Sequence, residues 1–265
     1  MLYIVCALHC EAKPLIDFYH LSAEPDAKFP VFSNEQIKLI ISGIGKVSSA
    51  VAMGYLYASG NENNYVAWLN VGIAGHKNFP LGSLLNINKV SDAATEINYY
   101  PTRLPNINVT SASAVTVDKP AEIYEGSSVW DMEASAFMAT ATRFTVNELI
   151  QVLKVVSDNQ DHHVDNVDKS LVKKLIEQNI PEIHEVVIAL QNQLEEFKAV
   201  YGEDELFKQC LQHCHFSQYQ KKSLQRLLQR WRIFNVDANF QLLQQFKDSQ
   251  AVIEFLQFEL EKIQL

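Results

Sequence analysis

The chain has 265 residues, of which 48% are hydrophobic and 20% charged, and its formal net charge is -9. This length supports one large domain, or a medium domain with an appendage, and the apolar content excludes a disordered chain. The longest apolar runs fall short of the ~18 residues that a membrane-spanning helix needs, and the acidic balance disfavours nucleic acid as a partner.

The first residues, MLYIVCALHCEAK, begin an apolar β-type run at once and carry no basic leader. A secretory signal would need such a leader and a longer apolar stretch, so we expect no export. The cysteines form two pairs with equal spacing, Cys6/Cys10 and Cys210/Cys214. Free thiols in a reducing compartment are the simpler interpretation, although an even count is also compatible with disulfides. We therefore expect a cytoplasmic protein.

Apolar, β-branched runs alternate with helix-period segments from residue 2 to residue 200. The predicted strands are Leu2–Leu8, Ile37–Ser42, Val66–Val71, Leu84–Val90, a short one near Val115–Val117, and Leu149–Val156. The predicted helices are Glu11–Tyr19, Lys46–Ala58, Asp131–Phe144 and Val167–Val200, the last interrupted by Pro181. This alternation predicts an α/β fold with a buried, mainly parallel sheet. Ligands of such sheets bind outside the carboxyl ends of the strands.

Composition changes near Gly202, after which glutamine is frequent and glycine does not occur. Residues 202–265 contain eight acidic and eight basic side chains, so the net charge of -9 belongs to the preceding residues. The segment KKSLQRLLQRWR, Lys221 to Arg232, is amphipathic, and its apolar stripe consists of Leu224, Leu227, Leu228 and Trp231. Such a stripe usually packs against another helix. We expect a separate helical unit, whose basic face is the alternative contact for nucleic acid or an acidic protein.

Two motifs contain metal-ligand residue types. Cys210 and Cys214 lie four residues apart with histidines nearby, and the segment 157–168 contains the adjacent His162 and His163. Zinc sites need further ligands at fixed spacing, and adjacent histidines do not face the same side of a helix. We therefore interpret the cysteines as buried thiols and the histidines as part of a solvated loop, with metal binding as the alternative in both places.

Three acids follow predicted strands or begin a predicted helix. Glu11 follows the first strand, Glu133 lies in the apolar stretch VWDMEASAF, and Asp158 ends the last strand. Several carboxylates at one sheet edge suit a reaction that builds positive charge on a sugar ring while a leaving group is protonated. A lone acid near a helix start is usually a cap, which is our interpretation of Asp131.

Four stretches, in order, resemble the purine nucleoside phosphorylase and nucleosidase superfamily, and most closely 5'-methylthioadenosine/S-adenosylhomocysteine nucleosidase and futalosine hydrolase. They are ALHCEAKPL, SGIGKVSSA, NVGIAGHKNFPLGSLLNINKVSD, and DMEASAF followed by VVSDNQD. The resemblance implies a three-layer αβα fold around a central twisted mixed sheet for residues 1–201. Residues 202–265 would form an all-helical C-terminal extension.

The resemblance also implies roles for the acids. Glu133 would hydrogen-bond the ribose hydroxyls and stabilise an oxocarbenium-like transition state, with Met132 packed against the sugar. Asp158 would protonate N7 of the leaving purine, and Glu11 would deprotonate the attacking water. The reaction would be hydrolysis of the N-glycosidic bond of a purine nucleoside, without a metal or an organic cofactor.

Further substrate-binding candidates follow from their places beside these stretches. They are Ile73, Gly75 and His76 around the glycine loop GIAGH, Ser113 in the predicted base-facing segment TSASAVTV, and His9 beside the first acid. For both histidines a purely structural role is the alternative. The chain departs from the family in three ways. It is shorter between Asp92 and Trp130, Lys154 stands where methylthioadenosine nucleosidases commonly have arginine, and Ile73 stands where they have a hydroxyl residue near the water site.

Phosphorolysis is the alternative reaction, and it requires cationic groups that hold phosphate beneath the sugar. Before residue 203 the only arginines are Arg103 and Arg143, and neither matches the family's phosphate loop, which favours hydrolysis. A third possibility is a catalytically weak nucleoside-binding protein whose helical tail recruits a protein partner. By analogy with relatives we also expect a homodimer.

Overall fold

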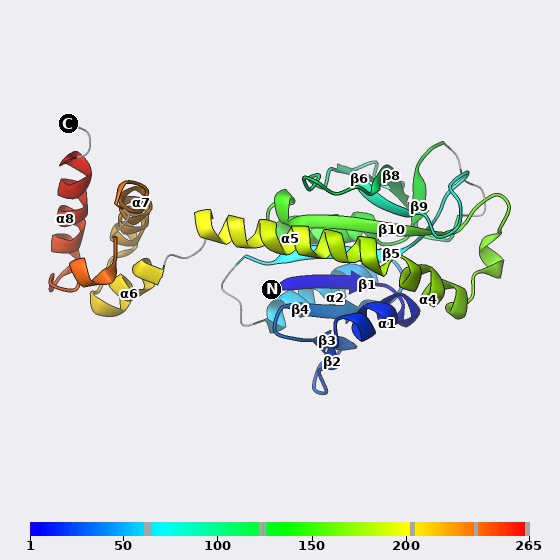
Figure 1. Ribbon diagram of the computed structural model, residues 1–265, viewed down its shortest axis with the longest axis horizontal. Coiled ribbons are helices and arrows are strands. Elements are labelled where there is room, and N and C mark those ends of the chain that lie inside the picture. Colours follow the sequence, from blue (N-terminus) through cyan, green and yellow to red (C-terminus); the bar gives the residue numbers. More distant parts are fainter. Residues whose placement is uncertain (61–64, 122–123, 125, 202–204, 236–237, 263–265) are drawn as a thin grey trace. The chain divides into compact units, whose positions relative to one another are not determined.

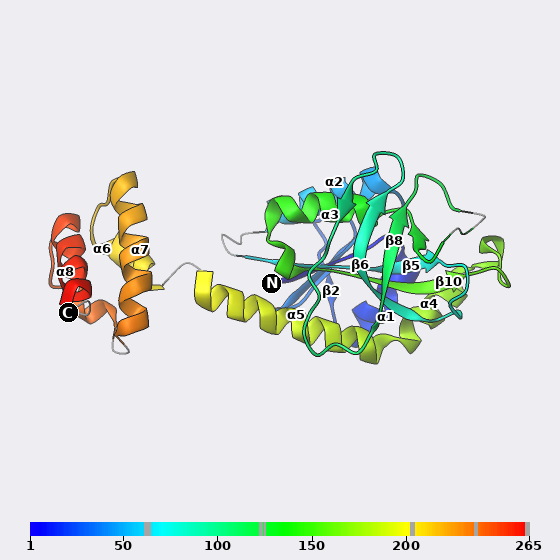
Figure 2. The same ribbon diagram turned by 90° about the horizontal axis from the view of Figure 1, so that it is seen from above.

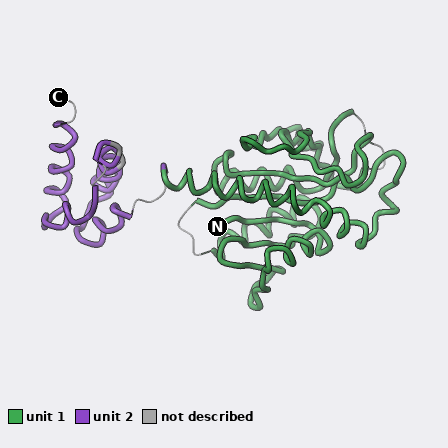
Figure 3. The backbone as a smooth tube through the Cα atoms, in the orientation of Figure 1, with its two compact units in different colours: residues 1–199 green, residues 200–265 purple. Residues whose placement is uncertain are grey.

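The computed structural model describes residues 1–60, 65–121, 124, 126–201, 205–235 and 238–262. The chain divides into two compact units, Met1–Ala199 and Val200–Leu265 (Figure 3). The division lies close to the change of composition near residue 202, while the assignment of the two parts as domains stays a prediction. Within the described ranges, no helix is both long and apolar enough to cross a membrane.

The first unit is built on a mixed sheet in which the described residues form ten strands (Figure 1). They are β1 Leu2–Cys6, β2 Ser22–Ala23, β3 Val31–Ser33, β4 Ile37–Ile41, β5 Ala67–Gly75, β6 Leu84–Asp92, β7 Asn98–Tyr99, β8 Thr110–Thr116, β9 Val129–Asp131 and β10 Ile150–Asp158. The order β10-β6-β8-β9-β5-β1-β4-β3-β2, with an additional pairing of β10 and β5, closes five strands into a ring. Central β5 pairs in parallel with β1 and β10.

Helices cover both faces of this sheet (Figure 2). They are α1 His9–Phe18, α2 Lys46–Ser59, α3 Ala134–Phe144, α4 Lys169–Gln178 and α5 Ile180–Tyr201, with short 3-10 turns η1 Asn147–Leu149 and η2 Val164–Asn166. Alternate residues of each strand face opposite layers: Leu2 and Ile4 pack with α1, α4 and α5, whereas Tyr3 and Val5 pack with α2 and α3. The predicted three-layer αβα fold is confirmed.

The helix predicted over Asp131–Phe144 begins later than expected. Val129–Asp131 forms β9 instead, and α3 starts at Ala134. The Asp131 carboxylate accepts a hydrogen bond from the Ala134 backbone N–H at 2.8 Å, which turns the chain from strand into helix. Periodicity missed this boundary because strand and helix follow each other without an intervening polar loop.

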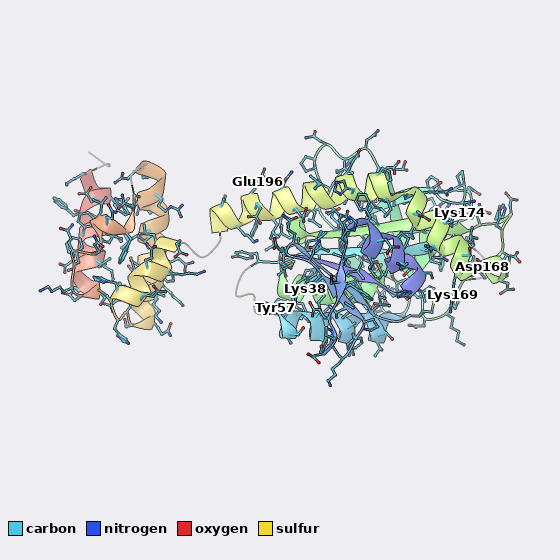
Figure 4. The ribbon with its side chains drawn as sticks, turned by 60° about the horizontal axis from the view of Figure 1, so that its bottom comes forward. Lys38, Tyr57, Asp168, Lys169, Lys174 and Glu196 are labelled. Atoms are coloured by element: carbon cyan, nitrogen blue, oxygen red, sulfur yellow. The ribbon has the colours of Figure 1, made fainter. Side chains whose placement is uncertain are left out.

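The predicted interruption at Pro181 is present. Pro181 is the second residue of α5, where its missing N–H breaks no helical hydrogen bond. The preceding α4 begins after Asp168 (Figure 4). The Asp168 carboxylate accepts a hydrogen bond from the Leu171 backbone N–H at 2.7 Å. The short strands β2, β3, β7 and β9 were not predicted, because two or three residues are too few to show a period.

In the second unit the described residues are mainly helical. The elements are α6 Glu205–His213, α7 Gln218–Phe234, the 3-10 turn η3 Phe240–Leu242 and α8 Ser249–Lys262. Leu224, Leu228 and Trp231 on α7 are fully buried in one apolar cluster with Leu256 of α8, so the predicted packing of this stripe against another helix is confirmed. Cys210 and Cys214 of the same cluster are both buried.

Candidate active site

A pocket of about 160 Å³ opens where three neighbouring parallel strands end. Its lining includes Ala7 directly after β1, Gly75 at the end of β5 and Asp158 at the end of β10. Apolar side chains such as Ile44 and Trp130 form further walls. This is the edge of the sheet at which ligands of α/β proteins bind. The candidate site is therefore a cavity with an apolar body and a small set of polar groups.

The pocket collects acidic side chains. Glu11, Asp131, Glu133 and Asp158 all line it, although they come from three separate stretches of the sequence. No Lys, Arg or His is among the lining residues in the part of the chain that the structure describes. The three acids singled out from the sequence thus meet at one pocket, whose described lining carries only negative formal charges.

Glu11 joins the start of α1 to the sheet. Its Oε2 accepts from the Leu8 backbone N–H at 2.8 Å and its Oε1 from the Ile73 backbone N–H at 2.9 Å. A side chain at Gly72 would begin 3.1 Å from Oε1, so glycine leaves room for this carboxylate. Burial raises the pKa of Glu11, whereas the amide hydrogen bonds and the nearby Lys154 charge act in the opposite direction.

Glu133 bridges the starts of two helices. It is the residue before α3, and its Oε1 accepts from the Gly45 backbone N–H, just before α2, at 2.7 Å. Gly45 has φ +96°, a backbone conformation that favours glycine. Burial raises the pKa of Glu133 to about 7; the Lys154 charge lowers it and the Asp131 charge raises it further. The carboxyl therefore changes charge near neutral pH.

Asp158 is the acid at the end of β10. Its Oδ1 accepts a hydrogen bond from the Ser157 hydroxyl and its Oδ2 accepts one from the Tyr124 hydroxyl. Burial raises the pKa of Asp158 to about 6, and the charge of His163 lowers it. A carboxyl with this pKa can carry a proton for transfer near neutral pH.

Asp131 and Lys154 form a buried ion pair beside these acids. The Lys154 Nζ lies 2.8 Å from Asp131 Oδ2, and both side chains are almost fully buried. Burial lowers the pKa of Lys154, but the charges of Asp131, Glu133 and Glu11 outweigh this effect and raise it. Asp131 also accepts from the Thr116 hydroxyl at 2.6 Å. The expected role of Asp131 at the helix start is confirmed.

The other predicted substrate-binding residues divide into two groups. Met132, Gly75 and Ile73 line the pocket. His76, Ser113 and His9 do not occur in its described lining.

The structure gives the physical reasons for the second group. The Nδ1 of His76 accepts from the backbone N–H groups of Asn78 and Phe79, and its Nε2 lies 3.2 Å from the Ser127 carbonyl oxygen. Both ring nitrogens of His76 thus lie against backbone groups. Ser113 lies in β8 beside β6, and His9 is exposed near Phe32. The side chains at these three positions are therefore not part of the described lining of the pocket.

Sequence reasoning did not single out Tyr124, Ile44 or Trp130 as lining residues. Trp130 belongs to the stretch VWDMEASAF, so the acids beside it were a usable signal. Tyr124 had no such signal, because it is an isolated aromatic residue in a segment without periodicity.

Neither a protein-family model nor a curated protein matches the sequence. Solved structures do match. Arabidopsis thaliana 5'-methylthioadenosine nucleosidase superimposes with a TM-score of 0.59 at 15% identity over 71% of this chain and 95% of that chain. The Neisseria meningitidis 5'-methylthioadenosine/S-adenosylhomocysteine nucleosidase in complex with methylthio-immucillin-A superimposes with a TM-score of 0.57 at 15% identity, over 70% of this chain and 97% of that chain. The Chlamydia trachomatis protein CT263 (MTAN) superimposes with a TM-score of 0.56 at 20% identity, over 71% of this chain and 97% of that chain.

The chain has the fold of these nucleosidases. The resemblance inferred from four short stretches is therefore confirmed at the level of the fold. Identities of 15% to 20% carry no more than the fold, because one fold supports many activities. Function therefore depends on the side chains of the pocket itself.

Proposed function

We propose that the protein hydrolyses the N-glycosidic bond of a purine nucleoside, or of a 5'-modified purine nucleoside, and releases the free base. The observation that carries this proposal is the meeting of Glu11, Glu133 and Asp158 at one pocket. Two of these carboxyls have a pKa raised towards neutrality, as acid catalysis requires. The nucleosidase fold supports the same conclusion.

Asp158 is the proposed general acid. A purine anion is a poor leaving group, and protonation at N7 turns the departing base into a neutral molecule. The raised pKa of Asp158, about 6, keeps a usable fraction of the carboxyl protonated near neutral pH. The proton passes from the Asp158 carboxyl to N7 as the bond between the base nitrogen and the sugar C1' breaks.

The other two acids serve the sugar and the water. Glu133, fixed by the Gly45 amide, accepts hydrogen bonds from the ribose hydroxyls and stabilises the positive charge that develops on the ring, against which Met132 packs. Glu11, held by two backbone amides, accepts a proton from water while the water oxygen bonds to C1'. The products are a neutral purine and a free sugar.

Hydrolysis is favoured over phosphorolysis by the charge of the pocket. A phosphate dianion would face four carboxyl groups, and no basic side chain belongs to the described lining. Lys154 is close, but it is paired with Asp131. The Gly45 amide before α2, a natural anion-binding group, already donates to Glu133. Phosphorolysis remains the alternative that phosphate dependence would reveal.

The test is a panel of purine nucleosides, including methylthioadenosine and futalosine, assayed for free base. We expect the wild type to cleave at least one of them. Glu11→Gln and Asp158→Asn should each slow base release by about 10² to 10⁴-fold while the fold persists by circular dichroism. Glu182→Gln, an exposed acid on α5, is the matched control and should retain activity. Equal activity of the control and both pocket variants would contradict the assignment.

A binding protein with little turnover is the second candidate, because the second unit exposes large aromatic side chains that could contact a protein. Tyr219, Phe234 and Phe258 are each more than half exposed. This alternative predicts nucleoside binding without base release. The homodimer and the cytoplasmic location stay predictions.

A further inference from the structure

The hydroxyl of Tyr124 is hydrogen-bonded to one carboxylate oxygen of Asp158, the proposed general acid. Tyr124 is only 8% exposed, lines the pocket and donates a hydrogen bond to Asp158 Oδ2. Its ring lies directly against Gly75, where the Cβ of any other residue would overlap the ring atoms. The absence of a side chain at Gly75 is therefore what allows the phenol to reach Asp158.

Both oxygens of Asp158 act as acceptors in this arrangement, one from Ser157 and one from Tyr124. Two hydroxyl donors stabilise the ionised carboxylate. Purine N7 is itself an acceptor and needs the opposite form, a protonated Asp158 that donates. The phenol and N7 therefore require different protonation states of the same group, so they compete for it.

We propose that Tyr124 is a positioning residue that competes with the purine for Asp158, so that the substrate must displace the phenol before Asp158 can act as an acid. The inference rests on the proposed function in taking a purine as the displacing group. When the phenol withdraws, the carboxylate takes up a proton from the solvent and presents it to N7. Recognition of the base and activation of the acid become one event.

Tyr124→Phe tests this competition because it removes the hydroxyl and keeps the ring. The probe is free adenine, and its dissociation constant is measured by titration calorimetry near neutral pH. We expect adenine to bind about tenfold more tightly to the variant, the effect of one hydrogen bond to a charged group that no longer has to be broken. Tyr19→Phe, whose hydroxyl lies 3.2 Å from the His184 Nδ1 outside the described lining, is the control and should bind adenine as the wild type does.

The pH profile gives a second measurement that a merely structural role would not move. Loss of the phenol donor raises the pKa of Asp158, so the alkaline limb of kcat/KM for a cleaved nucleoside shifts to higher pH in Tyr124→Phe and not in Tyr19→Phe. In the wild type, the complex should take up protons when adenine binds, because Asp158 becomes protonated. Calorimetry in two buffers of different ionisation enthalpy detects this proton uptake. Unchanged or weaker adenine binding by Tyr124→Phe, or binding to the wild type without proton uptake, overturns the proposal.

These outcomes separate the inference from the proposed reaction. If no nucleoside is cleaved but Tyr124→Phe tightens adenine binding, hydrolysis is wrong and the competition stands. If nucleosides are cleaved and adenine affinity is unaltered in Tyr124→Phe, the competition is wrong and hydrolysis stands.

Discussion

The two units bury different kinds of side chain. The first unit buries Glu11, Asp131, Glu133, Asp158 and Lys154 at or beside one pocket. In the described part of residues 200–265, every buried side chain is apolar or a cysteine, and the charged ones lie outside the core. Burial of charge costs free energy unless partners compensate it. Packing alone therefore explains the second unit, whereas the first contains an arrangement of buried charges that packing does not require.

Asp158→Asn in the pocket should have the largest effect on this contrast. An amide cannot supply the acid proton, so we expect kcat/KM for base release to fall by about 10² to 10⁴-fold. Glu254→Gln on α8 makes the same chemical change in an exposed acid of the second unit and should leave the rate unchanged. A comparable loss in both variants would break the distinction between the units.

Lys154→Met should destabilise the first unit, because it leaves the Asp131 carboxylate buried without its cation. Removal of one partner of a buried ion pair typically costs about 3 to 5 kcal/mol. The free energy of unfolding in urea, compared with the wild type, measures the loss. Lys262→Met removes the exposed pair with Glu259 and should change that free energy by less than about 1 kcal/mol. Similar values for the two variants would contradict the account of the pocket.

Trp231→Ala should act on the second unit alone. The side chain is fully buried in the cluster of residues 206–260, and truncation of such a residue costs about 3 to 5 kcal/mol. Hydrogen exchange should show lost protection in α7 and α8, with the rate of base release per molecule unchanged. A fall in that rate would mean that the second unit contributes to catalysis.

Glu133→Gln should lower activity, and its stability relative to the wild type should increase as pH rises. The pKa of Glu133 is about 7 in the folded chain, above its ordinary value of 4.5. Between these values the unfolded chain has released a proton that the folded chain retains, so wild-type stability falls with rising pH, by on the order of 3 kcal/mol. Glutamine does not ionise, so the stability of the variant lacks this pH dependence.

Urea unfolding of wild type and Glu133→Gln should therefore show little difference below about pH 4.5. The variant should become progressively more stable than the wild type towards pH 7 and above. A difference that does not change with pH would contradict the raised pKa.

Much of the fold could be predicted because its long strands are continuous apolar runs. The predicted strands Leu2–Leu8 and Leu149–Val156 correspond to β1 and β10. Strands of two or three residues could not be predicted, since pairing with neighbours, not local pattern, holds them in place. The boundary at Ala134 depends on the hydrogen bond that the Asp131 carboxylate accepts from the Ala134 backbone N–H, which a periodic pattern does not encode.

The candidate site was predictable where residue type and position agree. Glu11, Glu133 and Asp158 are acids at strand or helix ends, and the sheet topology brings such ends together. His76 had the right residue type, but its ring nitrogens are used by the backbone of its own turn and by Ser127. The contact of Tyr124 with Asp158 depends on the open surface of Gly75, a relation between distant residues that one sequence does not reveal.

The most direct test of the central claim is base release from a cleaved purine nucleoside with and without phosphate, with the sugar product identified. The account predicts release at the same rate in phosphate-free buffer and a free sugar as the product. Release that depends strictly on phosphate and yields a sugar 1-phosphate would contradict hydrolysis, and no base release from any purine nucleoside of the panel would contradict glycosidase activity altogether.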